Sequence, residues 1–403
     1  MKARQFIEDL DLKGRRVLIR VDFNVPLDEN QKITDNARIV AALPSIRRIV
    51  ESGGKCILMS HLGRPKGQRV ESMSLKPAAE ELSLLLEKNV SLAPDCIGSE
   101  VEKMVSQMEE GELLLLENLR FHQGETKNDP QFCEALARLG EVYINDAFGT
   151  AHRAHASTAG VAALMEDRAV GYLIRKELEF LGAAVLDPQK PFTAILGGAK
   201  VSDKIIVIER LMEKVDALII GGGMANTFLK AQGMEIGDSL LEEDALETAK
   251  NLLDEAKKCG VKIYLPVDIC TAPELHQEVE TKFLKVEDKV QAGWKILDIG
   301  PESVKQFGSV IQNSKTVLWN GPMGVFEYPA FASGTRGVTE ALAKATDAGA
   351  VSIIGGGDSA AAVNQFGMQD RITHISTGGG ASLEFLEGKE LPGVSVIPEK
   401  MNI

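Results

Sequence analysis

The chain has 403 residues, of which 44% are hydrophobic and 26% are charged. These proportions are typical of soluble globular proteins and exclude a disordered or collagen-like chain. At ~150 residues per domain, the length predicts two large domains. The chain carries 58 acidic against 45 basic side chains, a net charge of −13. Because such a field repels polyanions, it disfavours general binding to nucleic acid or anionic membranes, and an anionic ligand would need a cluster of basic residues.

Three further features of the sequence point to the cytoplasm. No stretch approaches the ~18 consecutive apolar residues of a membrane span, and the first residues carry charges where a signal peptide has its apolar segment. The five cysteines are scattered and include no C-x-x-C pair. This usage is typical of unpaired thiols in a reducing compartment. We therefore expect a cytoplasmic protein without membrane or nucleic-acid partners.

Short apolar runs that end in Gly, Asn or Asp alternate along the chain with amphipathic segments. In the first half the runs are 16–22, 55–60, 113–118 and 141–146, and in the second half they are 192–198, 217–223, 262–268, 296–300, 316–321, 351–357 and 372–380. Helical patterns between them include 205–215 and 245–259. Apolar strands without alternation, separated by helices, indicate parallel sheets covered on both faces. The fold class predicted is α/β, with two doubly wound, Rossmann-like domains of similar size.

The boundary between the domains is predicted near residues 170–190. Residues 174–186 form a helical pattern with apolar positions at 174, 178, 181 and 185, and the Asp-Pro-Gln-Lys-Pro sequence at 187–191 then stops the helix. We therefore expect a first domain over 1–170, an interdomain helix and hinge over 171–190, and a second domain over 191–387.

Basic residues follow the apolar runs of the first half. The arginines near predicted strand ends are Arg38, Arg64, Arg120 and Arg153. Any one of them could be an ordinary surface residue. Because parallel strands end at the same edge of a sheet, their recurrence there instead predicts a pocket for a small, highly anionic molecule. Asp22 and Asn24, after the first strand, could cap a turn or accept hydrogen bonds from a substrate hydroxyl.

Glycine dominates the strand ends of the second half. The Gly-rich turns are 197–204, 221–223, 320–324, 355–359 and 378–380. Glycine lets the backbone approach a phosphate, and a following helix N-terminus presents N–H groups to it. One such turn would be only a tight turn, but five of them, with Lys200, Lys204 and Asp358 inside, predict a nucleotide phosphate site. Asp358 is a candidate Mg²⁺ ligand, since this ion favours one or two carboxylates together with phosphate oxygens.

A dinucleotide site is an alternative interpretation of the turn at 355–359. Gly355, Gly357 and Ala360 fit the pattern G-x-G-x-x-A, but the next predicted strand lacks the acidic end that would hold a ribose. No G-x-x-x-x-G-K-[ST] motif occurs in the chain. The sequence therefore favours a nucleotide site that is neither a P-loop nor a typical dinucleotide fold.

Eight segments of the chain carry a resemblance to a known family. They are VDFNVP (21–26), HLGRP (61–65), ENLRF (117–121), NDAFGTAHRAHAS (145–157), GGAKVSDK (197–204), WNGPMGVFE (319–327), GGGDSA (355–360) and STGGGAS (376–382). In this order, over nearly the whole chain, they resemble the motifs of phosphoglycerate kinases of the bacterial type. The motifs are long enough to make a chance match negligible.

The resemblance implies a role for each of these sets of residues. In the first domain, 3-phosphoglycerate would be bound by Asp22, Phe23, Asn24, Arg38, His61, Leu62, Gly63, Arg64, Arg120 and Arg153. In the second domain, MgATP or MgADP would be bound by Lys204, Ile296, Asn320, Glu327, Gly356, Gly357, Asp358 and Ser359, with Asp358 near the metal. Catalysis is assigned to Arg38, Lys200, Lys204 and the backbone N–H groups of Gly378, Gly379 and Gly380. Residues 388–403 are expected to return to the first domain. Ile296 departs from the glycine that many members have near the base.

The implied reaction is reversible phosphoryl transfer between 1,3-bisphosphoglycerate with ADP and 3-phosphoglycerate with ATP, a step of glycolysis and gluconeogenesis. The acceptor is a carboxylate that is already ionised at neutral pH, so no general base is needed. Catalysis would consist of in-line positioning and charge neutralisation. We expect a monomer whose two domains close about the hinge when both substrates bind.

Two other classes of function remain open at this stage. One is an NAD-linked oxidoreductase that uses the turn at 355–360, and the other is a nucleotide-binding protein without catalysis. The missing acidic strand end disfavours the first, and the charged sets retained in both halves disfavour the second.

Overall fold

The computed structural model describes residues 4–400, apart from the side chains of 183–186. These residues divide into two compact units. The first unit contains residues 4–179 and 389–400, and the second contains residues 180–388. Among the described residues, no helix has the length and apolar character needed to cross a membrane.

The first unit is built on a parallel sheet with the strand order β3-β4-β2-β1-β5-β6, counted over the described residues. Its strands are β1 (Arg16–Arg20), β2 (Lys55–Met59), β3 (Val90–Leu92), β4 (Leu113–Leu115), β5 (Val142–Asn145) and β6 (Asp167–Val170). After β4 the chain crosses to the other side of β1, so the topological switch point lies between β1 and β5. The buried centre of β1, with Val17, Leu18 and Ile19 fully enclosed, shows that both faces of the sheet are covered.

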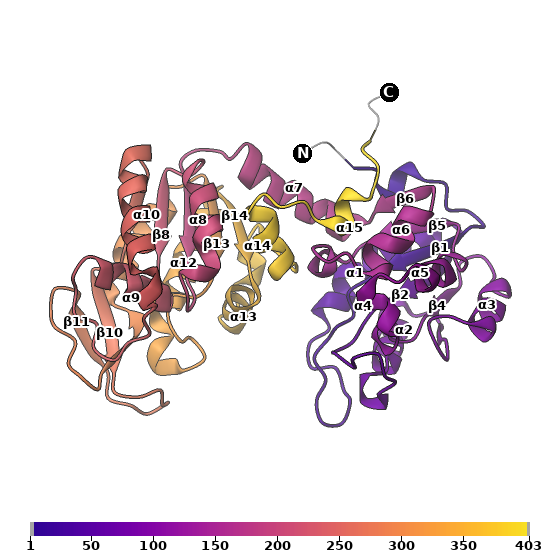
Figure 1. Ribbon diagram of the computed structural model, residues 1–403, viewed down its shortest axis with the longest axis horizontal. Coiled ribbons are helices and arrows are strands. Elements are labelled where there is room, and N and C mark those ends of the chain that lie inside the picture. Colours follow the sequence, from indigo (N-terminus) through magenta and orange to yellow (C-terminus); the bar gives the residue numbers. More distant parts are fainter. Residues whose placement is uncertain (1–3, 401–403) are drawn as a thin grey trace. The chain divides into compact units, whose positions relative to one another are not determined.

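Helices pack around this sheet (Figure 1). They are α1 (Ala37–Glu51), α2 (Lys76–Leu86), α3 (Ser99–Ser106), α4 (Gln123–Lys127), α5 (Pro130–Ala137), α6 (Val161–Leu164) and the C-terminal α15 (Pro392–Ser395). The segment that carries α15 is tied to β5 and its following loop: Asn145 donates to the carbonyl of Gly393 at 2.7 Å, and the Gly393 N–H donates to that of Ala151 at 2.8 Å. Residues 389–400 therefore belong to the first unit, although they follow the second in sequence.

The second unit repeats the doubly wound plan. Its parallel sheet has the order β15-β14-β13-β7-β8-β9 over the described residues, so the switch point lies between β7 and β13. The strands are β7 (Phe192–Leu196), β8 (Ala217–Ile220), β9 (Lys262–Tyr264), β13 (Thr316–Asn320), β14 (Val351–Gly355) and β15 (His374–Ile375). A second, antiparallel sheet contains β10 (Asp268–Ala272), β11 (Lys282–Lys285) and β12 (Lys295–Ile299).

The helices of the second unit follow its strands in sequence, and α14 comes after the last strand. They are α8 (Ile205–Met212), α9 (Gly222–Ala231), α10 (Leu246–Cys259), α11 (Pro301–Gln312), α12 (Ser333–Asp347), α13 (Gly357–Gln365) and α14 (Gly380–Leu386). The predicted helix at 174–186 is present as α7 (Tyr172–Leu186), and the division between the two units falls inside it, after Glu179.

The predicted fold class, α/β with two parallel sheets, is confirmed. One strand assignment was wrong: the run at 296–300 was expected in a parallel sheet, but β12 lies in the antiparallel one. The apolar run does not show whether the strand pairs in parallel or antiparallel fashion. In the structure, β12 is buried only from Asp298 onward, unlike the fully buried parallel strands β7, β8 and β13. The strands that lacked a predicted counterpart are β3, β6, β10 and β11.

Glycines pack closely at the switch point of the second unit. Gly197 follows β7 and Gly321 follows β13, and the Gly197 N–H donates to the carbonyl of Asn320 at 2.9 Å. A Cβ on Gly321 would lie 2.3 Å from the carbonyl oxygen of Gly197, and the φ angle of Gly321 is +97°. The two strand ends can approach this closely only because neither residue carries a side chain.

Replacing Gly321 with alanine should therefore destabilise the protein by about 4 kcal/mol, the upper range for a single substitution. Gly349→Ala is a matched control, because Gly349 has a φ of +94° but its Cβ would meet nothing within 4 Å. This control should cost only about 1–2 kcal/mol, the penalty of a left-handed conformation. Denaturant unfolding measures both losses, and equal losses would show that the close approach does not require glycine.

Candidate substrate sites

Polar residues of the first unit gather at the carboxyl edge of its sheet. The neighbouring strands β4, β2, β1 and β5 end at this edge, and each is followed by one of the segments singled out from the sequence. The switch point between β1 and β5 lies in the same row of strand ends. In open parallel sheets, this is where ligands bind.

Asp22 and Asn24 organise the loops at this edge. Asp22 is buried, and its Oδ2 accepts a hydrogen bond from Nη1 of Arg38 at 2.6 Å. The Asn24 Oδ1 accepts from the backbone N–H of Gly63 at 2.8 Å. Phe23, fully buried between them, donates its N–H to Oγ of Ser60 at 2.8 Å. The loop after β1 is thus fastened to the loop after β2.

Arg120 is held in the same way by neutral acceptors. Its Nη1 donates to the carbonyl of Gly63 at 2.8 Å, and its backbone N–H donates to Asn118 Oδ1 at 3.1 Å. The Nδ2 of Asn118 in turn donates to the carbonyl of Leu62 at 2.7 Å. The Nε of Arg120 is buried without a hydrogen-bond partner among the described residues. The guanidinium is therefore fixed in place without a carboxylate that would cancel its charge.

Arg64, Arg120 and Arg153 line one cavity of about 470 Å³. Lys66, Gly67, His122, Gln123, Thr126, Lys127 and His155 complete its wall. The structure therefore brings three of the four predicted arginines into one positively charged pocket. Arg38 is not among the lining residues, and its guanidinium is held by Asp22 instead.

The pKa of His61 reflects the positive charge around it. Its imidazole is buried, and burial together with the fields of Arg20, Arg120, Arg38 and Arg153 holds its pKa well below the usual value. The pKa of His155 is lowered to about 4, first by burial and then by Arg120 and Arg153. Both imidazoles are thus neutral at pH 7, and the positive charge at this edge belongs to the arginines.

Sequence reasoning missed Arg20. Its side chain is 1% exposed, and its Nη2 lies 3.1 Å from Nδ1 of His61. Its Nε donates to Oγ of Ser157 at 2.9 Å, and that hydroxyl donates to the fully buried Glu125 at 2.7 Å. Arg20 lies inside β1, where the apolar run concealed it, and only its position at the end of the strand could have drawn attention to it.

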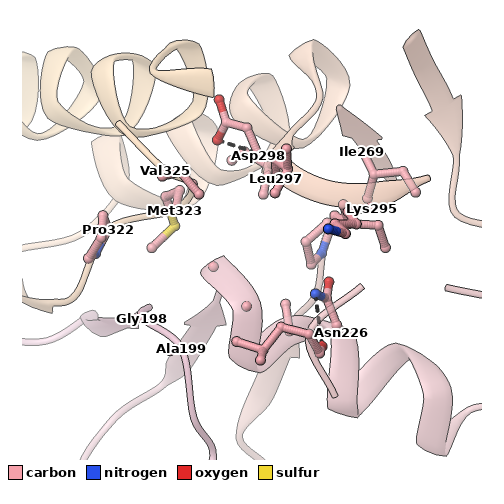
Figure 2. Close-up of a pocket in the computed structure, with 18 of the residues that line it drawn as sticks. Gly198, Ala199, Asn226, Ile269, Lys295, Leu297, Asp298, Pro322, Met323 and Val325 are labelled. Carbon is pink, nitrogen blue, oxygen red and sulfur yellow. Dashed lines mark hydrogen bonds between the residues drawn. The ribbon is translucent and has the colours of Figure 1, made fainter. Parts of the chain in front are cut away.

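The second unit contains a cavity of about 500 Å³ with a largely apolar wall. Met323 and Pro322 form one side, and Ile269 and Lys295 lie across from them (Figure 2). Three of the residues assigned to the nucleotide lie in its wall, namely Ile296, Glu327 and Asp358. Gly198, Ala199, Gly222 and Gly223 bring the glycine turns after β7 and β8 to the same space. A flat apolar slot bordered by glycine turns suits a purine base with attached phosphates.

Lys204 and Asn320 meet at the switch point of this sheet. The Lys204 Nζ donates to the Oδ1 of Asn320 and, at 3.3 Å, to its carbonyl oxygen. Lys204 is 8% exposed, and burial lowers its pKa to about 8, although Asp203 and Asp358 act in the opposite direction. The Nδ2 of Asn320 is buried with no hydrogen-bond partner among the described residues. The Lys204 amine and an unpaired N–H donor of Asn320 therefore lie at the same position.

The helix α13 begins beside this pair. Its N-cap is Gly356, with a φ of +89°, and a Cβ there would lie 3.1 Å from Nδ2 of Asn320. Gly357 and Asp358 are exposed in the first turn, whereas the Oγ of the buried Ser359 accepts from the N–H of Gly321 at 2.6 Å. The glycines leave the first N–H groups of a nine-residue helix open to a ligand.

The remaining predicted residues are less closely tied to this cavity. Lys200 is exposed, and its charge helps to lower the pKa of Glu242. Gly378–Gly380 precede and begin α14, with the N–H of Gly378 donating to Ser376 Oγ at 3.1 Å. Neither Lys200 nor these glycines are in the cavity wall.

Asp298 is a residue of this region that the sequence did not reveal. It lies in the cavity wall (Figure 2). Its Oδ2 accepts from the N–H of Gly334 at 2.7 Å, at the start of α12. A Cβ on Gly324 would lie 2.3 Å from its carboxylate. Burial raises the pKa of Asp298 to about 7. Its hydrogen bonds, from Ser333 and Gly334 among others, assign it to the support of the start of α12.

Comparison with known proteins decides the family. A sequence profile described as phosphoglycerate kinase matches residues 7–389. The chain belongs to the phosphoglycerate kinase family. The phosphoglycerate kinase of Chloroherpeton thalassium is 56% identical over 394 residues, which cover 98% of this chain and 99% of that protein. The phosphoglycerate kinase of Chlorobaculum tepidum is 55% identical with the same coverage.

Solved structures of phosphoglycerate kinases share the fold. The structure from Coxiella burnetii has a TM-score of 0.88 and 42% identity, and the one from Pyrococcus horikoshii has a TM-score of 0.84 and 33% identity. Each match covers 98% of both chains. The family consists of ATP-dependent kinases with nucleotide and small-molecule substrates, and the resemblance noted in the sequence is confirmed.

The lowered pKa of Lys204 has a measurable consequence. At pH 8 its amine is about half protonated in the free protein, and a polyphosphate bound beside it would restore the charged form. We therefore expect uptake of up to about half a proton on nucleotide binding at pH 8, falling towards zero at pH 6, where the amine is already charged.

Calorimetric titration in two buffers with different ionisation enthalpies measures this uptake. The Lys204→Met variant should show none at pH 8. Uptake that is the same in this variant, or net proton release in the unmodified protein, would contradict the assignment.

Proposed function

We propose that this chain transfers a phosphoryl group reversibly between 1,3-bisphosphoglycerate and ADP, with 3-phosphoglycerate and ATP as the other pair. Membership of the phosphoglycerate kinase family over residues 7–389 is the observation that carries this proposal. Each unit supports it with an anion site of distinct chemistry at the switch point of its sheet.

In the first unit, the arginine cavity suits 3-phosphoglycerate. Arg64, Arg120 and Arg153 can donate paired hydrogen bonds to phosphate and carboxylate oxygens. Asp22 and Asn24 offer acceptors for the substrate hydroxyl, and Arg38 lies next to Asp22. His61, Leu62 and Gly63 would shape the floor of the site, with Phe23 packed behind it.

In the second unit, the apolar cavity suits the nucleotide. Ile296 and the neighbouring apolar side chains would cover the base, and Glu327 would accept from the ribose hydroxyls. Lys204, Asn320 and the turn from Gly356 to Ser359 would bind the phosphates. The buried Nδ2 of Asn320 supports this, since it is a donor in need of an acceptor.

A Mg²⁺ ion fits the residues that remain. Asp358 is exposed at the start of α13, its carboxylate makes no hydrogen bond to any residue that the structure describes, and it faces the same cavity. One carboxylate with phosphate oxygens is the ligand set that Mg²⁺ prefers. We infer that Asp358 holds the ion, which when bound neutralises negative charge on the nucleotide phosphates.

The chemistry requires no proton transfer by the protein. The attacking group is a carboxylate, already ionised at pH 7, and neither His61 nor His155 is in the imidazolium form at that pH. The residues of this chain instead orient the two substrates and neutralise charge on the transferred group. We assign this role to Arg38, Lys200, Lys204 and the N–H groups of Gly378–Gly380. Closure of the two units about α7, a monomeric state, a cytoplasmic location and a role in glycolysis belong to the same proposal.

A coupled assay with 3-phosphoglycerate and MgATP tests the proposal directly. It also separates the two alternatives, because a dehydrogenase would need NAD and a non-catalytic binder would bind nucleotide without turnover. Nucleotide binding without formation of ADP would overturn the proposed activity.

Replacing Arg38 with alanine should lower kcat by at least ~10³, the scale of a lost cationic clamp on phosphoryl transfer. Arg47→Ala is a matched control on the same helix α1: its side chain is exposed and donates to the carbonyl of Leu85 at 2.9 Å, away from the site. The control should keep kcat within about twofold of the unmodified enzyme. A near-normal kcat in Arg38→Ala would remove this residue from the catalytic set.

Replacing Asp358 with asparagine should weaken use of the metal–nucleotide complex and leave 3-phosphoglycerate binding unchanged, because the two sites lie in separate units. We expect KM for MgATP to rise at least about tenfold, the scale of a lost charged interaction. Asp347→Asn is the control, since Asp347 is an exposed carboxylate paired with Arg371 at the end of α12. Equal losses for both substrates in Asp358→Asn would show that the assignment of substrates to units is wrong.

A further inference from the structure

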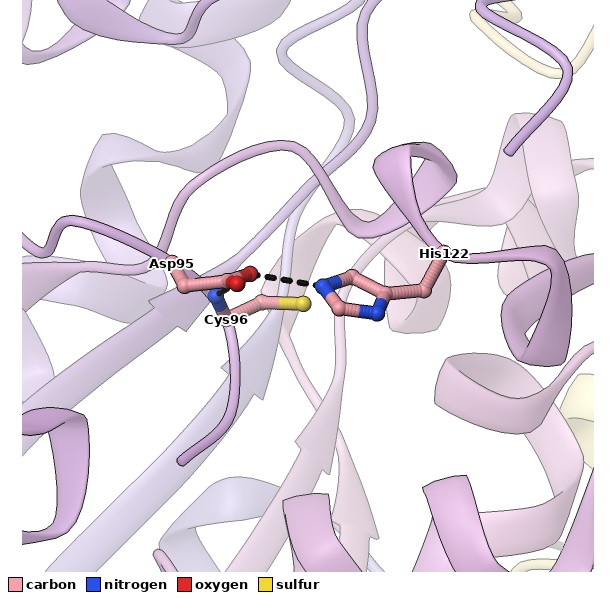
Figure 3. A group of neighbouring side chains, drawn as sticks. All are labelled: Asp95, Cys96 and His122. Atoms are coloured by element: carbon pink, nitrogen blue, oxygen red, sulfur yellow. Dashed lines mark hydrogen bonds and ion pairs between the residues drawn. The ribbon is translucent and has the colours of Figure 1, made fainter. Parts of the chain in front are cut away.

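A cluster of three metal-ligating side chains lies in the first unit, apart from the residues assigned to catalysis. Asp95 and Cys96 follow β3, and His122 follows the short 3-10 helix Leu119–Phe121 after β4. Because β3 and β4 are neighbours in the parallel sheet, the two segments meet at its carboxyl edge. Figure 3 shows the carboxylate, the thiol and the imidazole turned towards one another.

The geometry of this cluster is close to that of a metal site. The Nε2 of His122 and the Oδ1 of Asp95 are 2.7 Å apart, and a potential ligand atom of each of the three residues lies within 4.8 Å of the others. Two protein ligands on a tetrahedral Zn²⁺ are about 3.3–3.5 Å apart, given the usual Zn–N and Zn–S distances. Small rotations of the side chains would bring all three atoms to one ion.

The kinds of ligand select a class of metal. Sulfur and imidazole nitrogen favour Zn²⁺ and similar transition-metal ions over Mg²⁺ or Ca²⁺, which prefer oxygen ligands alone. We propose that Asp95, Cys96 and His122 form a binding site for a transition-metal cation of the Zn²⁺ type. The side chains of Asp95 and His122 are 43% and 30% exposed, so solvent can reach the ion and supply its fourth ligand.

The charges around the cluster are compatible with a cation. Asp95 and Glu125 place negative charge near the Cys96 thiol, and the basic Arg69 interacts electrostatically with Asp95. Arg69 is itself paired, at 3.0 Å from Glu71 and 3.9 Å from Glu117. These two carboxylates largely offset the positive charge of Arg69 at the cluster.

Metal binding would replace two existing interactions. The hydrogen bond between His122 and Asp95 would be exchanged for bonds to the ion. The Cys96 S–H bond would break, an S–metal bond would form and the proton would leave to solvent. Affinity for the metal should thus increase with pH.

The same observations argue against other roles for the cluster. Cys96 is fully buried and the Nε2 of His122 is bonded to Asp95, so a cysteine–histidine catalytic pair is disfavoured. Cys96 is fully buried beside the polar side chains of Asp95 and His122. A cysteine that only fills space in a core would be surrounded by apolar side chains instead. His122 also lies in the wall of the arginine cavity, so the metal site adjoins that cavity and shares this one residue with its wall.

Titration with Zn²⁺ alone tests the site, without substrates. The background should carry Cys259→Ser, because Cys259 is the exposed one of the five thiols. We expect one equivalent of Zn²⁺ to bind. Cys96→Ser and His122→Gln should each lower the Zn²⁺ affinity at least about 100-fold, because even the loss of a residue that only hydrogen-bonds to a metal ligand can cost that much. Cys133→Ser is the matched control: Cys133 is also buried in the first unit, and its thiol donates to Asn128 at 3.3 Å.

The spectrum of Co²⁺ provides a second test that needs no variant at the site. Bound Co²⁺ should show a thiolate-to-metal charge-transfer band, stronger at pH 8 than at pH 6 and unaffected by excess Mg²⁺. Absence of this band in the Cys259→Ser protein would overturn the proposal even if Cys96→Ser failed to fold. Equal Zn²⁺ affinity in folded Cys96→Ser, or an equal loss in Cys133→Ser, would also overturn it.

Discussion

Parallel strand pairing is the constraint on which both candidate substrate sites depend. In each sheet the chain first builds strands on one side of its starting strand and then crosses to the other side. Two neighbouring loops therefore diverge at the switch point, between β1 and β5 in the first unit and between β7 and β13 in the second. The backbone groups at these strand ends have no partner in the sheet, and the divergence leaves space for a ligand.

The two units use this space differently. In the first, buried neutral acceptors such as the carbonyl of Gly63 fix arginines without cancelling their charge. Burial, together with the resulting field, lowers the pKa of His61 and of His155, so both imidazoles are neutral at pH 7. In the second, glycines let β7 and β13 approach so closely that the amine of Lys204 can reach Asn320. In a protein with a net charge of −13, the two proposed anion sites are thus confined to two places where basic groups are concentrated.

Much of this arrangement could be predicted from the sequence, since it rests on local signals. The apolar runs indicated the parallel strands, and arginines or glycines after them indicated the character of each edge. Arg20 could not be recognised, because inside β1 it looks like part of a strand and its link to His61 is a tertiary contact. The antiparallel position of β12 likewise depends on its pairing with β10 and not on its own residues.

The same distinction applies to the site residues. The motifs around Lys204 and Asn320 were visible, but the hydrogen bond between them joins positions 116 residues apart. Asp95, Cys96 and His122 attracted no attention in the sequence, because their spacing matches no common metal motif and only the pairing of β3 with β4 brings them together. Contacts between residues that are distant along the chain could not be predicted from the sequence.

The central claim is that each unit binds its own substrate through its own cations. Calorimetric titration of 3-phosphoglycerate and of MgADP into Arg120→Gln and Lys204→Met tests it most directly. Arg120→Gln should lose at least about tenfold in affinity for 3-phosphoglycerate, or about 1.4 kcal/mol, and keep its affinity for MgADP. Lys204→Met should show the reverse pattern. If both variants weakened the same ligand, or if each weakened both ligands equally, the account of two independent anion sites would be contradicted.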